Sequence, residues 1–173
     1  MRMNFGCGSV QPDGWVNIDK LDSGAYSDIR TWNGQWSERY DYIVANHSIS
    51  DLDFHELDPA LKELRRCLRP GGVLRVLVPD LMGAVKAYQR RDYEWFPQGN
   101  DLTSIDERFC TFVGWFGTAK SNFTEGYLRL LLERAGFRTV IRSNVRGRTL
   151  SSDREIVSLD DRQPTALVME GQK

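Results

Sequence analysis

The feature that most constrains the fold is a short apolar run at residues 2–5. It breaks into Gly6-Cys7-Gly8 and is followed by a second run that ends in Asp19. A strand that exits through Gly-x-Gly, followed by a strand that ends in a carboxylate, is typical of a nucleotide-binding edge in an α/β sheet. The glycines allow a sharp turn and a close approach of backbone to ligand, and Asp19 can accept hydrogen bonds from both ribose hydroxyls. Gly-x-Gly alone is often only a turn, so this prediction depends on the rest of the chain.

Length and composition bound the class of protein. With 173 residues, 40% of them hydrophobic, and a formal net charge of -1, the chain is expected to form one domain, residues 1–173. The balanced charge does not indicate a nucleic-acid partner or a membrane surface, and no apolar stretch approaches the ~20 residues of a membrane span. Without a signal-peptide pattern, a cytoplasmic location is expected. The three widely spaced cysteines indicate neither disulfides nor a metal site.

Hydrophobic periodicity predicts a mostly parallel sheet. Residues 73–78 are nearly continuous in Val and Leu, as is typical of a strand in the middle of such a sheet. Residues 8–15 are too few for the usual crossover helix, so one face of the sheet is expected to be thinly covered there. Strands are expected at residues 2–5, 15–19, 28–30, 40–45, 73–78, 137–143 and 165–169, the last two antiparallel at the far edge, with residues 146–164 as a polar excursion between them.

Helix start and stop signals predict four helices. The clearest has Asp58 as its expected N-cap and Pro59 at its first position, and it is expected to end at the Arg-Pro-Gly-Gly of residues 69–72. Residues 92–123 are rich in aromatic side chains; a helix and loop packed over the sheet explain at least half of them, and the sharper hypothesis is a lid or acceptor-site insertion. Further N-caps are expected at Asp80, Ser104 and Thr124, and Gly136 is expected to end the last helix.

Four segments together resemble a known family. They are Phe-Gly-Cys-Gly at residues 5–8, Val-Asn-Ile-Asp at 16–19, Tyr-Asp-Tyr-Ile-Val-Ala-Asn-His at 40–47, and Leu-Arg-Arg-Cys-Leu-Arg-Pro-Gly-Gly-Val-Leu at 64–74. These segments are similar to successive motifs of class I S-adenosylmethionine-dependent methyltransferases. The similarity is closest to short proteins of the small-molecule branch, which are often linked to cell-surface sugar pathways. It implies a single-domain Rossmann-like α/β fold, with a mostly parallel twisted sheet, an antiparallel edge strand and an abbreviated first crossover helix.

The resemblance implies S-adenosylmethionine as cofactor and S-adenosylhomocysteine as product. Gln11 stands where a dinucleotide fingerprint has its third glycine, which agrees with a cofactor that has no pyrophosphate. Carried over residue by residue, Phe5, Gly6, Cys7 and Gly8 line the methionine and ribose end, Asp19 holds the ribose hydroxyls, Lys20 and Leu21 flank the adenine, Asp28 and Ile29 meet its amino group and ring, and Asn46 and His47 lie where methyl group and acceptor meet.

His47 is the candidate catalytic base. Methyl transfer is a direct displacement that depends mainly on alignment and exclusion of water, so a base is needed only if the acceptor must lose a proton. An equally open alternative is that His47 only hydrogen-bonds to loop backbone or caps a turn. Many relatives carry His-x-Leu-Glu-His at this point, whereas this chain has His-Ser-Ile-Ser-Asp at residues 47–51, so a mechanism that relies on a second histidine is in doubt.

The predicted function is methyl transfer to a small acceptor, with a sugar derivative as one candidate. The alternative is a catalytically inactive cofactor-binding protein of the same fold with a regulatory or interaction role. A nicotinamide-dependent oxidoreductase is disfavoured by the glycine pattern and by the lack of a recognisable Tyr-x-x-x-Lys or Cys/His set. The thin cover expected near the short crossover also predicts a homodimer.

Overall fold

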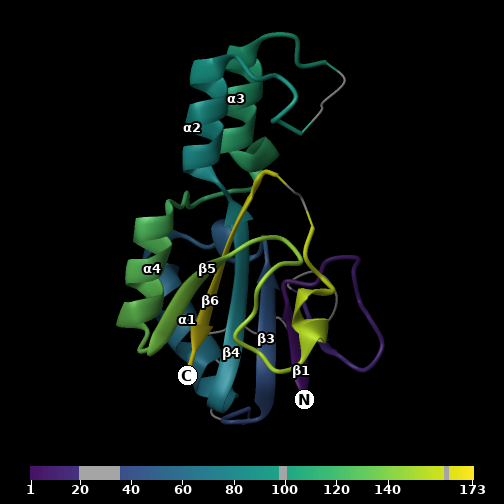
Figure 1. Ribbon diagram of the computed structural model, residues 1–173, viewed down its shortest axis with the longest axis vertical. Helices are drawn as coiled ribbons and strands as arrows, with labels where there is room; N and C mark the ends of the chain where they lie inside the picture. The colour runs from purple at the N-terminus through teal and green to yellow at the C-terminus, as the bar shows by residue number, and fades with distance from the viewer. Residues whose placement is uncertain (20–35, 98–100, 162–163) are drawn as a thin grey trace.

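The computed structural model describes residues 1–19, 36–97, 101–161 and 164–173. Within these residues, six strands form one sheet (Figure 1). The strands are β1 (Arg2–Phe5), β2 (Val16–Ile18), β3 (Tyr40–Asn46), β4 (Leu68–Pro79), β5 (Thr139–Ser143) and β6 (Ala166–Gln172), and their order across the sheet is β2-β1-β3-β4-β6-β5.

The strand directions confirm the predicted mostly parallel sheet. β1, β2, β3 and β4 are parallel to one another, and β6 runs antiparallel to both β4 and β5. The antiparallel strand therefore lies one place in from the edge, between two strands that precede it in the chain. The strand expected at residues 28–30 lies outside the described residues. Residues 6–15 join β1 to β2 without a helix, as the sequence predicts.

Two helices, α1 (Phe54–Cys67) and α4 (Glu125–Arg134), pack on one face of the sheet. Apolar side chains from α1, among them Leu57, Leu61 and Leu64, are fully buried against those of β1, β3 and β4. The predicted N-cap of α4 is confirmed, because Thr124 accepts a hydrogen bond from the backbone N of Tyr127 at 3.2 Å. These contacts form the larger core of the protein.

The start of α1 differs from the prediction. The helix begins after Asp53, where the Glu56 carboxylate accepts a hydrogen bond from the Asp53 backbone N at 2.8 Å, and not at Asp58. Such a reciprocal cap satisfies backbone donors more than a turn earlier. Pro59 consequently lies inside the helix, where it gives up one intrahelical hydrogen bond. The helix ends at Cys67, and the Arg-Pro-Gly-Gly segment forms the start of β4.

The opposite face of the sheet is covered by residues 144–161, here called the covering segment. It contains a short 3-10 helix, η4 (Arg154–Val157), whose Ile156 is fully buried and whose Val157 is nearly so. Both pack against a second core cluster that includes Trp15 and Tyr42. The expectation of a thinly covered face is therefore wrong, because the excursion between β5 and β6 packs on that face. The reason for expecting a homodimer, which was that thin cover, no longer holds.

A fully buried arginine interrupts the apolar run of β4. Arg75 donates from Nε to Asp160 Oδ1 at 2.8 Å and from Nη1 to Glu170 Oε1 at 2.6 Å. All three side chains have 0% of their surface exposed. Asp160 belongs to the covering segment and Glu170 lies opposite Arg75 on β6. Because a charge is buried only when it is paired, this cluster ties the covering segment to the sheet.

The aromatic-rich region forms a separate cluster beyond the carboxyl end of β4 (Figure 1). The cluster is built from α3 (Ile105–Val113) and the 3-10 helix η3 (Trp115–Gly117) of this region, together with α2 (Leu81–Arg90), which precedes it. The predicted caps are confirmed: Asp80 accepts from the Gly83 backbone N at 2.9 Å and Ser104 accepts from Glu107 N at 3.1 Å. A third 3-10 helix, η2 (Ile49–Asp51), follows β3. Among the described residues, no helix is both long and apolar enough to cross a bilayer.

Candidate functional site

A cavity of about 200 Å³ lies at the carboxyl ends of β1 and β3. This is the end of a parallel sheet where ligands bind in open α/β folds. The structure brings together here five residues that the sequence predicts for the site, Gly6, Cys7, Gly8, Asn46 and His47. The remaining lining residues are Asn4, Ser9, Val10, Leu159 and Asp161.

The floor of the cavity is the turn after β1. Gly6 and Gly8 have φ values of +72° and +52°, in the left-handed region that glycine adopts without strain. A Cβ atom on Gly6 would lie 2.1 Å from the Ser48 Cβ, so only glycine fits between β1 and the loop after β3. The Ser48 hydroxyl also donates to the Phe5 carbonyl at 2.8 Å, which fixes the distance between the two strand ends.

Asp19 closes the same turn from β2. Its Oδ2 accepts a hydrogen bond from the backbone N of Gly8 at 2.8 Å, and the residue is 9% exposed. The carboxylate thus lies directly behind the glycine turn. Phe5 differs from the prediction in that it does not line the cavity; its side chain is fully buried in the core. The other predicted cofactor contacts, Lys20, Leu21, Asp28 and Ile29, lie outside the described residues.

Asn46 supplies a polar group to one wall. Its Nδ2 donates to the Leu159 carbonyl at 2.8 Å, which connects the end of β3 to the covering segment. Its Oδ1 is buried and makes no hydrogen bond to any residue that the structure describes. A buried acceptor of this kind costs free energy unless a donor reaches it. The side chain is therefore suited to a ligand that carries an N–H or O–H group.

His47 is the most constrained side chain of the site. Its backbone φ is +55°, its backbone N donates to the Leu77 carbonyl at 2.8 Å, and its side chain is 8% exposed. The imidazole stacks on the indole of Trp115, with ring centroids 5.1 Å apart. Its Nε2 lies 3.5 Å from Oδ1 of Asp161. His47 is thus held by contacts of both its backbone and its ring.

Sequence reasoning did not assign Asn4, Ser9 and Val10, which adjoin the glycine turn, nor three residues far from it in the sequence. Leu159 and Asp161 come from a stretch without periodicity or a motif, so no local signal marks them. Trp115 belongs to the aromatic-rich region, whose composition indicated a role near the ligand without saying which ring would reach it. Among the described residues, no group of three His, Cys, Asp or Glu side chains could hold a metal ion.

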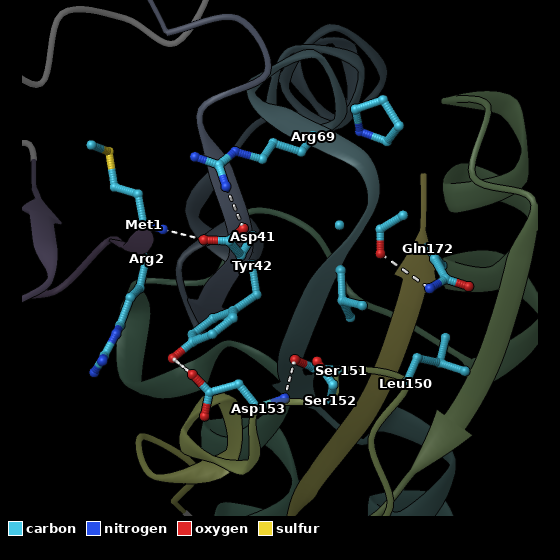
Figure 2. Close-up of a pocket in the computed structure, with 14 residues that line it drawn as sticks. Met1, Arg2, Asp41, Tyr42, Arg69, Leu150, Ser151, Ser152, Asp153 and Gln172 are labelled. Atoms are coloured by element: carbon cyan, nitrogen blue, oxygen red, sulfur yellow. Dashed lines mark hydrogen bonds and ion pairs between the residues drawn. The ribbon is translucent and has the colours of Figure 1, made fainter.

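A larger hollow of about 550 Å³ lies at the opposite end of the sheet. Figure 2 shows Arg69 and the amine of Met1 directed at Asp41, and the Tyr42 hydroxyl directed at Asp153. Burial, and to a lesser extent the Asp153 carboxylate, raise the pKa of Tyr42, so its hydroxyl stays protonated and donates to Asp153. These groups satisfy one another at the amino ends of the parallel strands. The hollow thus lies at the end of the sheet opposite to the one where ligands bind in open α/β folds.

No protein-family model matches the sequence, and no curated protein sequence does either. Solved structures do match. An S-adenosylmethionine-dependent methyltransferase from Archaeoglobus fulgidus is 12% identical with a TM-score of 0.61, and the match covers 99% of this chain and 85% of that chain. An S-adenosylmethionine-dependent methyltransferase from Mesorhizobium loti is 13% identical with a TM-score of 0.54, covering 99% and 90% of the two chains.

A third match is the 1,6-didemethyltoxoflavin-N1-methyltransferase of Burkholderia thailandensis, with 1,6-didemethyltoxoflavin and S-adenosylhomocysteine bound. It is 16% identical with a TM-score of 0.54, covering 99% of this chain and 70% of that chain. Other matched chains are longer, and this chain spans 37%, 63% and 61% of three of them. At these identities the likeness establishes the architecture. The fold of this chain is that of the S-adenosylmethionine-dependent methyltransferases.

Proposed function

We propose that this protein binds S-adenosylmethionine at the cavity beside β1 and β3 and transfers its methyl group to a small-molecule acceptor. The observation that carries the proposal is the convergence of Gly6, Cys7, Gly8, Asn46 and His47 on one cavity at the carboxyl end of the sheet. Five residues from two segments far apart in the sequence meet where ligands bind in this class of fold.

The described walls fit one end of the cofactor. Pockets for whole ligands of this size usually measure about 300–1,000 Å³, whereas the cavity measures about 200 Å³. The glycine turn lets backbone approach the methionine part, and the buried Asn46 Oδ1 is an acceptor suited to its ammonium group. Asp19, next to that turn, would accept the ribose hydroxyls. The adenine contacts proposed at Lys20, Leu21, Asp28 and Ile29 belong to the undescribed stretch.

The chain's own contribution to transfer is alignment and exclusion of water. S-adenosylmethionine, when bound, supplies an activated methyl group on a sulfonium. Trp115 and His47 would form an aromatic wall at the methyl-transfer end, and the aromatic-rich region at residues 92–123 would act as the lid that shapes the acceptor pocket. The stack between these two rings supports that role, because it brings the region directly onto a cavity residue. The acceptor is a small molecule, with a sugar derivative as one candidate.

Calorimetric titration with S-adenosylmethionine, S-adenosylhomocysteine and NAD tests the proposal. We expect both sulfur ligands to bind and NAD not to bind. Asp19→Ala should weaken binding about 10- to 100-fold, because roughly 1.5–3 kcal/mol of charge-assisted hydrogen bonding is lost. Asp58→Ala, which removes a partly exposed carboxylate on α1 that pairs with Lys62, is the matched control and should bind normally.

Absence of binding by either sulfur ligand would refute the proposal. Binding that persists without turnover across a broad panel of hydroxyl and amine acceptors would favour the alternative, a cofactor-binding protein with a regulatory role. The two outcomes are separable because the binding measurement needs no acceptor.

A further inference from the structure

The inference concerns Asp161 and rests on the proposed function. We infer that Asp161 is a positioning residue for His47, and that the acceptor is consequently a hydroxyl compound whose proton His47 removes. Asp161 stands in the covering segment, more than a hundred residues after His47, and its carboxylate Oδ1 lies 3.5 Å from the imidazole Nε2.

The place of Asp161 is fixed by its neighbour. Asp160 binds Arg75 within the sheet, and its Oδ2 also accepts from the backbone N of Arg146 at 2.6 Å. Glu170, the other carboxylate on Arg75, accepts from the backbone N of Leu150 at 2.6 Å. The buried cluster therefore holds the covering segment at its end and along its first half. Burying three charged side chains carries a desolvation cost, and the result of this burial is that the covering segment is held in one position.

The segment also contacts the end of β3 directly. The Leu159 carbonyl accepts from Asn46 Nδ2 at 2.8 Å, so residues on both sides of Asp160 touch the cavity. The Asp161 side chain is 48% exposed, whereas that of His47 is 8% exposed. A half-exposed carboxylate stays ionised without a large desolvation cost, and its field reaches an imidazole that is shielded from water.

A carboxylate at Nε2 has two effects on an imidazole. It favours the tautomer with hydrogen on Nε2, which places the basic lone pair on Nδ1, and it stabilises the imidazolium that forms when Nδ1 takes a proton. Among the residues that the structure describes, the other titratable groups around the cavity are the Cys7 thiol and, behind Gly8, the Asp19 carboxylate. Asp160 does not line the cavity and forms an ion pair with Arg75.

This pairing assigns a proton path for a hydroxyl acceptor. As the acceptor oxygen forms its bond to the methyl carbon, the carbon–sulfur bond breaks and its electron pair stays on sulfur. The hydroxyl proton passes to His47 Nδ1, which leaves a neutral ether and a neutral thioether. A thiolate acceptor has no proton to lose on methylation, so it would not need His47 as a base.

The two histidines of the chain allow a direct test by proton NMR. The C2–H resonances of His47 and His55 are followed from pH 4.5 to 9, and His55→Gln assigns them. Asp161→Asn should lower the pKa of His47 by roughly half a pH unit or more, because an opposite charge near the ring is lost. Asp153→Asn, which removes a carboxylate elsewhere in the covering segment, should leave the pKa of His47 unchanged.

An unchanged pKa of His47 in Asp161→Asn would overturn the inference, and so would an equal shift in Asp153→Asn. With a hydroxyl substrate in hand, the acid limb of kcat/KM should move with the same shift. The titration with S-adenosylhomocysteine separates the two proposals. If that ligand binds and Asp161→Asn leaves His47 unmoved, only the present inference fails; if it does not bind, the proposed function fails whatever the histidine does.

Discussion

The imidazole of His47 lies flat against the indole of Trp115, with the two ring planes within 2° of each other. Both residues have left-handed backbone, with φ values of +55° and +42°. A non-glycine residue in this region costs on the order of 1–3 kcal/mol and persists only where the surrounding structure imposes it. Two strained residues that meet ring to ring at a cavity are therefore held there by the fold, from β3 on one side and η3 on the other.

The stack predicts a ring-current effect. Protons over the face of an indole resonate upfield, so ring protons of His47 should lie upfield of their random-coil position. Trp115→Leu should move them back downfield, while Trp95→Leu, which removes an indole of the same aromatic cluster, should not. One-dimensional proton NMR of the three proteins measures this. Identical His47 shifts in all three would show that the rings are not stacked in solution.

The close approach at Gly6 predicts a large loss of stability for Gly6→Ala. Gly14 has φ +77° and no described atom within 4 Å of the added Cβ, so Gly14→Ala should cost only the backbone penalty, about 1 kcal/mol. Gly6→Ala carries the same penalty plus the clash with Ser48, which should add about 1–3 kcal/mol. Urea denaturation gives both free energies of unfolding. Equal losses at the two positions would contradict the packing described between β1 and the loop after β3.

The cysteines should react in a defined order. Mainly because it is buried, Cys67 has a pKa raised to about 12, so almost no Cys67 thiolate is present at pH 8. Cys110, in contrast, is exposed. Iodoacetamide at pH 8 should label Cys110 within minutes and Cys67 only after unfolding. Cys7, which lines the cavity, should react slowly and more slowly still with S-adenosylhomocysteine present. Peptide mass spectrometry over time follows all three, and rapid labelling of Cys67 in the folded protein would be inconsistent with this core.

The ion pairs of Glu125, at the junction of α4 and β5, should make the free energy of unfolding depend on pH. Hydrogen bonding from Arg142 is the main cause that lowers the pKa of Glu125, and Arg129 adds to it. Because the folded pKa lies below the unfolded value of about 4.3, the stabilisation is present above that pH and is lost as the pH falls through the folded pKa. Glu125→Gln should therefore unfold more easily at pH 7, by less than about 1 kcal/mol for a partly exposed pair.

This difference should shrink as the pH falls through the folded pKa of Glu125, because the wild-type carboxyl then becomes protonated too. Urea titrations at pH 7, 5 and 3 provide the measurement, with Glu133→Gln, an exposed position on the same helix, as the control. A gap between wild type and Glu125→Gln that stays constant down to pH 3 would mean that charge pairing is not its cause.

Local signals predicted most of the fold. The strand runs, the caps at Asp80, Ser104 and Thr124, and the glycine turn all depend on residues a few positions apart, which is the range over which periodicity and capping act. The pairing of Arg75 with Asp160 and Glu170 joins residues 85 and 95 positions apart. No local pattern encodes such a pairing, so the buried arginine looked like an interruption of an apolar strand.

The candidate site also contains one part that local signals predicted and one part that they did not. Its glycine turn and the Asn46-His47 end of β3 could be predicted because each follows a recognisable strand. The covering segment could not, since its few buried side chains, such as Ile156 and Val157, are separated by polar residues without a period. Asp161 reaches the cavity only through the long-range anchor beside it. Prediction from the sequence therefore ended where tertiary contacts replaced local ones.

The position of β6 sets an order of events during synthesis. β5 leaves the ribosome before β6, yet it joins the sheet only through β6, which inserts between β4 and β5. Until β6 emerges, β4 has an unpaired edge and Arg75 lacks its partner Glu170. The covering segment then also lacks the hydrogen bond from the Leu150 backbone N to Glu170. Unpaired strand edges and exposed hydrophobic surface make an incompletely folded chain prone to aggregation. A frameshift or stop codon just before residue 166 should therefore yield a chain that is degraded, not a shortened but folded protein.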